Sequence, residues 1–222
     1  KNADFLNSNE KIIINLLDNL TNTNIKRFII SSTQDVYGDS CNLSVTEDFP
    51  LLGNLSAYSC SKLNNENWVN FYQQKKGGMF LLLRFTGFVN GGGFVDYIIN
   101  QALSGENIEL YSKGKVCRDY IGIDDAINVL INSISIDEFN GVLPVNIGSG
   151  QIMPSLEIAK LVCEITQSKS KILITDTPSL KGDFVYNISR AEKLLNYKPN
   201  ILKENIIKYT QNRMMDIKAL KK

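Results

Sequence analysis

The segment KRFIISS, residues 26–32, decides the fold class of this chain. Its apolar centre, FII at 28–30, is a continuous hydrophobic run, which is typical of a strand buried on both faces of a parallel sheet. A helical stretch at 7–22 precedes it, and a long helix at 57–75 follows it. The next apolar segment, MFLLLRF at 79–85, predicts a second buried strand. We therefore expect an α/β fold built on a partial doubly wound (Rossmann-like) parallel sheet.

After Gly91 the pattern changes to shorter elements. The expected elements are a helix at 94–104, a strand at 108–111, a helix from 124, a strand at 142–147, a helix at 154–166, a strand at 171–175 and a final helix from 202. Together they predict a smaller C-terminal α/β region that follows the main sheet.

Tyr58 and Lys62 are the best candidates for proton transfer. A helix brings positions i and i+4 onto one face, so the phenol and the ammonium can share a pocket. A fixed positive charge would lower the pKa of a tyrosine from about 10 toward the range of a useful acid/base. Thr33, at the end of the first strand, could orient a substrate oxygen toward Tyr58. The alternative for the pair alone is structural, with an exposed lysine and a half-buried tyrosine.

Composition excludes several classes of protein. A net charge of +1 gives no sign of a nucleic-acid surface, and no apolar run reaches the length of a membrane span. The chain has no histidine, which excludes a Ser-His-Asp site and most zinc chemistry. We expect no metal site and reduced thiols in a cytoplasmic protein, because the four cysteines are far apart in sequence: Cys41, Cys60, Cys117 and Cys163.

Several segments match a known family in order and spacing. They are SSTQDVYG at 31–38, the Tyr58/Lys62 pair, RDYIGIDD at 118–125, VNIGSG at 145–150 and, more weakly, the strand-then-helix segment DFVYNISRAEKLL at 183–195. On these segments the chain resembles the extended short-chain dehydrogenase/reductase family, in its NAD-dependent epimerase/dehydratase branch that acts on nucleotide sugars. The resemblance covers nearly the whole chain.

The resemblance implies a nicotinamide cofactor, NAD or NADP, beside the Tyr/Lys pair. Tyr58 would be the acid/base, and Lys62 would lower its pKa and bond the nicotinamide ribose. Three further residues, Asn9, Ser31 and Phe85, would border the cofactor.

The implied substrate is a nucleotide sugar, bound by four residues. Thr33 would orient its hydroxyl, and Arg118 would hold its diphosphate, since a guanidinium donates two parallel hydrogen bonds. The alternative for Arg118 is an ion pair with Asp119 or Asp124. Gly87 stands where the family has a sugar-contacting Asn, and Lys181 stands where it has a diphosphate-binding Arg.

The motif at the end of the first strand limits which reactions of the family this chain can catalyse. Dehydratases of the family carry Thr-Asp-Glu there, whereas this chain has Thr33-Gln34-Asp35, and an amide cannot replace the acid. Dehydration is therefore not expected, and of the reactions that remain we favour C4 epimerisation through a 4-keto intermediate, which is the commoner role of this pattern in the family. The alternative is reduction of a 4-keto-6-deoxy nucleotide sugar.

The resemblance also predicts the organisation of the chain. Residues 1–90 would be the C-terminal part of a cofactor-binding domain with the Tyr/Lys site, and residues 91–222 mainly a substrate-binding region, interleaved with late sheet elements. No segment resembles the Gly-rich turn that holds the cofactor pyrophosphate, so about three β-α units, roughly 80 to 90 residues, would be missing. A hypothesis of another class is an inactive fragment or one half of a two-chain assembly. We expect the complete enzyme to be a homodimer.

Overall fold

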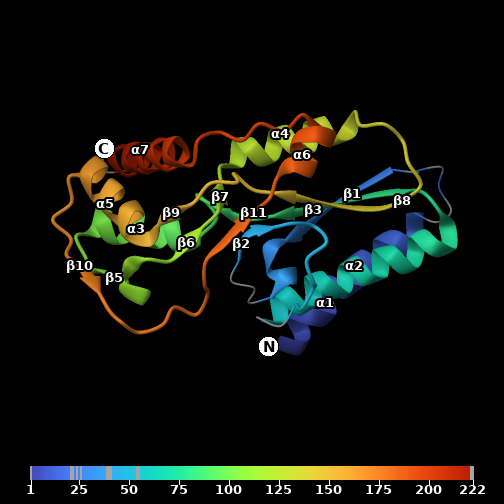
Figure 1. Cartoon of the computed structure of the whole chain (residues 1–222), viewed down its shortest axis with the longest axis horizontal. Coiled ribbons are helices and arrows are strands. Elements are labelled where there is room, and N and C mark those ends of the chain that lie inside the picture. The colour runs from blue at the N-terminus through green and yellow to red at the C-terminus, as the bar shows by residue number, and fades with distance from the viewer. Residues whose placement is uncertain are drawn as a thin grey trace.

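The computed structural model describes residues 2–20, 23, 25, 27–38, 42–53 and 56–220 (Figure 1). Seven α-helices are present in these ranges: α1 (Asn2–Leu20), α2 (Ala57–Lys76), α3 (Phe94–Ser104), α4 (Ile123–Ile134), α5 (Ser155–Thr166), α6 (Ser189–Leu195) and α7 (Leu202–Leu220). The strands are β1 (Arg27–Thr33), β2 (Asn42–Val45), β3 (Met79–Phe85), β4 (Gly87–Phe88), β5 (Ile108–Leu110), β6 (Cys117–Arg118), β7 (Tyr120–Ile121), β8 (Gly141–Ile147), β9 (Met153–Pro154), β10 (Ile172–Ile174) and β11 (Phe184–Tyr186). Two 3-10 turns are η1 (Gln34–Tyr37) and η2 (Ser112–Gly114).

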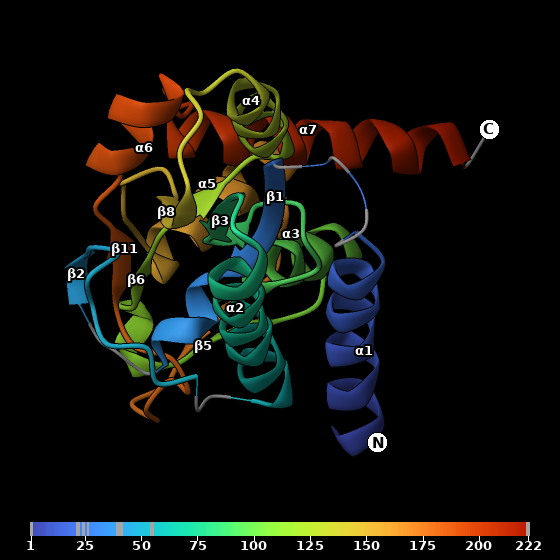
Figure 2. The ribbon, with the colours of Figure 1, turned by 90° about the vertical axis from the view of Figure 1, so that its right-hand side faces the viewer.

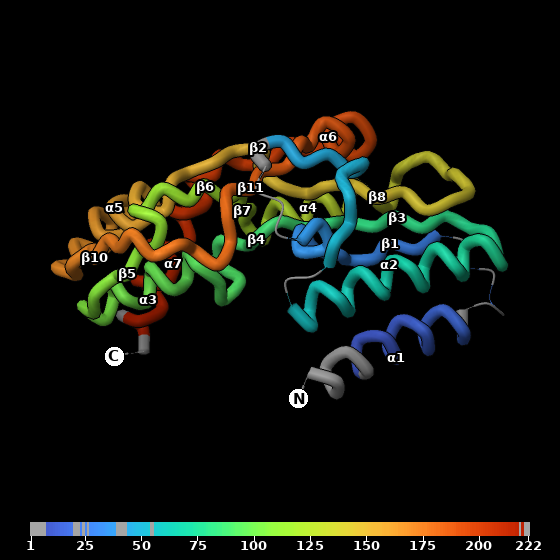
Figure 3. The backbone as a smooth tube through the Cα atoms, turned by 60° about the horizontal axis from the view of Figure 1, so that its bottom comes forward, coloured from blue at the N-terminus to red at the C-terminus, as the bar shows by residue number. Residues whose placement is uncertain are grey.

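The main sheet is parallel, with strand order β1-β3-β8. All seven residues of the central strand β3 are buried, as expected for a strand covered on both faces. Figure 3 shows α1 and α2 on one side of these strands and α4 and α6 on the other. The α/β class and the parallel sheet predicted from sequence are confirmed.

Each face of the sheet packs its own apolar cluster because side chains alternate along a strand. Phe80 and Leu82 point toward α1 and α2, where they pack with Ile13, Leu17 and Val69. The alternate residues of β3 pack against α4 and α6 in a second cluster: Leu81, Leu83, Phe85, Val129, Val145, Ala191 and Leu195. The main sheet and the helices on its two faces thus form three layers, helix–sheet–helix.

The second region has a separate core. Helices α3, α5 and α7 pack together over the parallel pair β5-β10. A four-stranded sheet, β2-β11-β6-β9, and the pair β4-β7 lie between this core and the main sheet. The proposed division at residue 90 stays a prediction.

Most long elements were predicted within one or two residues, and β3 and α3 at their observed bounds. The helix expected at 7–22 begins earlier, at Asn2, and residues 21, 22 and 26 lie outside the described ranges. The late segment at 183–195 forms β11 and α6, as predicted. Several strands of two to four residues were not predicted, because they are too short for a hydrophobic period: β2, β4, β6, β7 and β9.

No helix within the described ranges combines the length and hydropathy that a membrane crossing needs. In the same ranges, no group of three or more Cys, Asp or Glu side chains is placed to hold a metal ion. Cys60, Cys117 and Cys163 are free thiols, and Cys41 lies outside the described residues.

One edge of the main sheet, formed by β1, is unpaired in the described part of the chain. There β1 pairs only with β3, so its other edge has no strand partner. Figure 2 shows α4 and α2 on opposite sides of the sheet beside β1. Large apolar side chains of α4 are 43% to 62% exposed, and we call these five residues the α4 stripe: Ile123, Ile127, Leu130, Ile131 and Ile134. A contiguous exposed stripe of this kind is an interface or an aggregation liability.

We predict that this 222-residue chain self-associates through the α4 stripe. Ile131→Lys should shift it toward the monomer, because a charge in an apolar contact is costly to desolvate. The measurement is size exclusion with light scattering over a concentration series. Asn128→Lys adds the same charge at an exposed, polar position of α4 and should leave association unchanged. A monodisperse wild-type monomer would contradict the prediction.

Candidate functional site

The carboxyl ends of the three main strands meet in one row. The register aligns Thr33 with Phe85, and Phe85 with Ile147. Open α/β sheets bind ligands at this edge, because the strand ends and the loops that follow them leave a crevice. Two of these three residues, Thr33 and Phe85, were selected from sequence as site residues.

A cavity of about 560 Å³ opens beside this row. All four residues predicted to bind substrate line it: Thr33, Gly87, Arg118 and Lys181. Its volume lies in the range of small-molecule sites. The structure therefore brings to one place residues that are up to 148 positions apart in sequence (Thr33 to Lys181).

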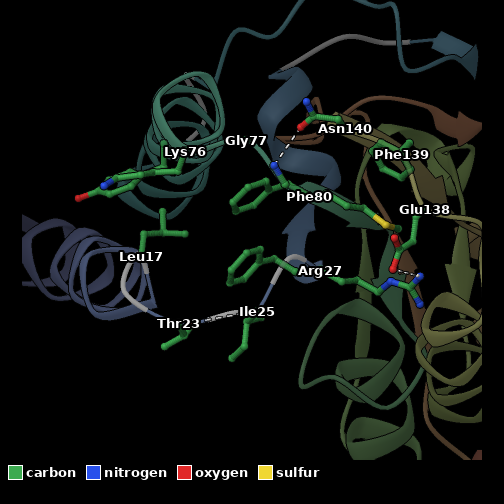
Figure 4. A pocket seen from close by; sticks show the side chains of 14 residues that line it. Leu17, Thr23, Ile25, Arg27, Lys76, Gly77, Phe80, Glu138, Phe139 and Asn140 are labelled. Atoms are coloured by element: carbon green, nitrogen blue, oxygen red, sulfur yellow. Dashed lines mark hydrogen bonds and ion pairs between the residues drawn. The ribbon is translucent and has the colours of Figure 1, made fainter.

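A second cavity of about 410 Å³ lies at the opposite, amino ends of β1 and β3 (Figure 4). The stacked rings of Phe28 and Phe80 line it, with Leu17 and Ile25. None of the predicted site residues lines this cavity, whereas the four predicted substrate residues line the first one, which we therefore take as the candidate site. Tyr58 and Lys62 are not among the lining residues of either cavity.

Helix α2 carries the Tyr/Lys pair at its first turns. Ser56 caps the helix by accepting a hydrogen bond from the Ser59 backbone N–H, and Ser59 Oγ accepts one from the Ser56 backbone in return. This capping box fixes the start of α2 just beyond the strand ends. The Tyr58 hydroxyl is hydrogen-bonded to the Thr33 side chain. The Lys62 Nζ donates to the Ser31 carbonyl at 3.2 Å and lies 6.0 Å from the centre of the Tyr58 ring.

The pKa of Tyr58 is raised, chiefly by burial. The Thr33 hydrogen bond lowers this pKa in part, and the negative charge of Asp35 raises it further. The effect of Lys62 on the pKa of Tyr58 stays a prediction, because the shift in this structure comes from burial, the Thr33 hydrogen bond and the charge of Asp35, and its net direction is upward. Burial also lowers the pKa of Lys62, and the charge of Glu66 opposes that effect.

The other expected cofactor residues surround this pair. Asn9 Nδ2 donates to Ser61 Oγ at 3.0 Å, which ties α1 to α2 one turn from Tyr58. Phe85 is buried, with its ring 5.7 Å from that of Phe88. The cofactor roles of Asn9, Ser31 and Phe85 stay predictions.

A buried polar cluster, which the sequence did not reveal, lies beneath the pair. Arg84 and Glu66 form a two-pronged ion pair, with Nη2–Oε2 at 2.7 Å and Nε–Oε1 at 3.0 Å. Glu66 also accepts from the Ser32 hydroxyl at 2.6 Å, and Arg84 donates to the Tyr37 hydroxyl at 2.7 Å. Tyr37 then donates to Asn146 Oδ1 at 2.6 Å. The only sequence signal for this cluster was the spacing of Glu66, one helical turn after Lys62.

Arg118 lies in the cavity wall on β6. Its Nη1 donates to the Gly182 carbonyl at 2.7 Å, and its guanidinium lies 5.5 Å from the centre of the Phe184 ring. Within the described ranges it pairs with neither of the alternative partners weighed from sequence. Asp124 is bonded to Lys208 at 2.5 Å, and Asp119 accepts from backbone groups elsewhere.

Lys181 does not lie free in the cavity. Its Nζ donates to both carboxylate oxygens of Asp35, at 2.9 and 3.1 Å. At Gly87, an added Cβ would meet the Tyr120 ring at 2.9 Å, so the local packing requires the absence of a side chain. Asp35 was not predicted as a site residue, since its partner Lys181 lies 146 positions away in the sequence.

These features define a class of protein: an α/β protein with a parallel sheet, a ligand cavity at the carboxyl ends of its strands, and a Thr-Tyr-Lys group beside it. The family model described as "NAD dependent epimerase/dehydratase family" matches residues 1–148. The chain belongs to this family.

Individual relatives are more distant. A UDP-glucuronic acid decarboxylase of Danio rerio is 28% identical over 83% of this chain and 46% of its own length. An uncharacterised UDP-glucose epimerase of Bacillus subtilis is 26% identical over 83% of this chain and 59% of its own length. An uncharacterised protein of Methanocaldococcus jannaschii is 25% identical over 96% of this chain and 67% of its own length. The chain thus spans about half to two thirds of these relatives.

Solved structures confirm the fold. The UDP-glucose 4-epimerase of Thermotoga maritima superposes with a TM-score of 0.82 at 20% identity, over 98% of this chain and 72% of that one. The UDP-glucuronic acid 4-epimerase of Bacillus cereus, solved with NAD, gives a TM-score of 0.79 at 23% identity, over 92% of this chain and 67% of that one.

The buried carboxylate of Asp119 predicts how the free energy of unfolding depends on pH. Its carboxylate accepts from the Ser149 N–H and hydroxyl and from the Gly150 and Tyr186 N–H groups, yet burial raises its pKa to about 6. Between the ordinary value near 3.9 and 6, the folded state binds more protons than the unfolded chain. This group should therefore lower the free energy of unfolding as the pH rises through that window, by up to ~1.4 kcal/mol per pH unit.

Urea unfolding at several pH values between 4 and 7 measures this slope. Asp119→Asn should remove the contribution and should also destabilise the fold, by about 1–3 kcal/mol, since its NH₂ group cannot accept from the N–H donors. Asp124→Asn, at an exposed carboxylate, is the control. An unchanged slope in Asp119→Asn would contradict the assignment.

Proposed function

We propose that this chain carries the acid/base and sugar-binding parts of an NAD-dependent nucleotide-sugar 4-epimerase. The observation that carries the proposal is the hydrogen bond between Tyr58 and Thr33 at the edge of the cavity. It joins a titratable hydroxyl to a second hydroxyl, that of Thr33, which lines a space of the size of a ligand site. Membership of the family supports the same chemistry.

The Tyr/Lys pair fits a nicotinamide cofactor. Lys62 is half-buried and its Nζ is positioned at the Ser31 carbonyl, so its remaining N–H donors can serve ribose hydroxyls. When bound, an oxidised nicotinamide supplies the hydride acceptor for the sugar C4 and a positive charge that favours the Tyr58 phenolate. Structural relatives were solved with NAD, which favours NAD over NADP here.

The chain's own residues then move one proton. Tyr58 takes the proton from the sugar O4 as the C4 carbonyl forms, and returns it to O4 when C4 is reduced from the other face. Thr33 holds the phenol in place and orients O4. Gln34 has its Oε1 bonded to the Thr86 hydroxyl at 3.0 Å and carries no acid, which disfavours dehydration.

The diphosphate of the substrate would lie toward Arg118. Its Nη1 donates one hydrogen bond to the Gly182 carbonyl, and among the residues that the structure describes the guanidinium has no other hydrogen-bond acceptor, so further N–H donors can serve phosphate oxygens. Lys181 lines the same cavity, where its charge is paired with Asp35. Relatives named for UDP-glucose and UDP-glucuronic acid support a UDP-sugar.

The second candidate function is reduction of a 4-keto-6-deoxy nucleotide sugar. The raised pKa of Tyr58 favours it, because a phenol that stays protonated at neutral pH serves as the acid that protonates O4. A homodimer in the cytoplasm is the assembly we expect for the complete enzyme. The hypothesis of an inactive fragment, or of one half of a two-chain assembly, predicts sugar binding without turnover.

Tyr58→Phe tests the acid/base role. In a form of the protein that interconverts UDP-glucose and UDP-galactose, it should lower turnover by about 10² to 10⁴. Folding should be nearly unchanged, since Tyr58 is 39% exposed. Tyr97→Phe, at a partly exposed tyrosine bonded to the Glu109 N–H, is the control. A Tyr58→Phe variant with more than half of the wild-type rate would contradict the assignment.

A further inference from the structure

Asp35 and Lys181 both line the cavity and form an ion pair with each other. Asp35 belongs to η1, directly after the strand end that carries Thr33, whereas Lys181 belongs to the loop between β10 and β11. Both oxygens of the carboxylate are engaged, at 2.9 and 3.1 Å from Nζ. The Asp35 side chain is 15% exposed, so water screens this charge only in part.

Asp35 lies where a sugar would react. It is two residues from Thr33, and its charge acts on the Tyr58 hydroxyl. Three formal charges line the cavity among the described residues: Asp35, Arg118 and Lys181. Because Lys181 is committed to Asp35, Arg118 is the one cation there without a carboxylate partner within the described ranges.

We propose that the Asp35–Lys181 pair is a specificity element that makes the cavity select nucleotide sugars with a neutral C6 group over their C6 carboxylates. The inference rests on the proposed function. In a sugar whose O4 faces Tyr58 and Thr33, C6 is joined to C4 through C5 and therefore lies near the same wall. A C6 carboxylate there meets the negative charge of Asp35.

The lysine does not compensate for this repulsion. To bind a sugar carboxylate, Lys181 would have to give up two charge-assisted hydrogen bonds and leave Asp35 unpaired in a poorly hydrated position. A CH₂OH or CH₃ group at C6 requires no such exchange. Selectivity of this kind uses an unfavourable interaction against the wrong ligand.

Calorimetric titration of this chain with UDP, UDP-glucose and UDP-glucuronic acid tests the proposal. The measured quantity is the ratio of the Kd for UDP-glucuronic acid to the Kd for UDP-glucose. In the wild type this ratio should exceed about five, and Asp35→Asn should lower it about five- to tenfold, since the repulsion is removed and Lys181 is released. Lys181→Met should raise it, because Asp35 then carries an uncompensated charge.

Lys208→Met is the matched control, since it breaks an exposed ion pair with Asp124 outside the cavity and should leave the ratio unchanged. Circular dichroism of each variant checks the fold. Binding of UDP with the same ratio in the wild type and in Asp35→Asn would overturn the specificity proposal alone. Absence of binding of all three nucleotides to the folded wild type would overturn the proposed function and the specificity proposal with it.

Discussion

The buried ion pair between Arg84 and Glu66 is the charged contact that joins β3 to α2, the helix that carries Tyr58. Both side chains are 4% exposed, and each charge is surrounded by further hydrogen bonds. Such a pair adds little stability relative to an apolar pair. Loss of one partner, however, leaves the other charge buried and unpaired, which lowers the free energy of unfolding by about 3–5 kcal/mol. The pair therefore acts as a constraint on geometry: α2 can pack on the sheet only in the register that brings Glu66 to Arg84.

That register sets the position of Tyr58 relative to Thr33. Glu66 lies one helical turn after Lys62, and its Oε1 accepts from Ser32, the residue before Thr33. Fixing Glu66 thus fixes the distance between the helix that carries Tyr58 and the strand end that carries Thr33. Through Tyr37 and Asn146 the same network reaches β8, so three strands and α2 share one set of polar contacts. A substitution at any residue of this network should therefore alter the geometry of the Tyr58–Thr33 hydrogen bond.

The sequence predicted those parts whose signal is local. The buried strands appear as apolar runs, α2 ends at Gly77, and the i, i+4 spacing placed Tyr58 and Lys62 on one face. The strands of two residues were not predicted, because their pairing depends on partners that are distant in sequence and not on their own composition. The partner of Lys181 was not predicted for the same reason, and the hydrogen bond from Lys62 to the Ser31 carbonyl involves a backbone group that only the fold brings close to it.

The cavity depends finally on how the two cores are held together. Asp119 lies between β6 and β7 and binds the loop after β8 and the strand β11 by hydrogen bonds to Ser149, Gly150 and Tyr186. The residue before it is Arg118, so the carboxylate that joins the regions also sets the position of the guanidinium relative to the strand ends. The Asp35–Lys181 pair makes a second connection between residues that line the cavity. A cavity held between two such connections keeps its charges at fixed distances, which is the condition for discriminating ligands by charge.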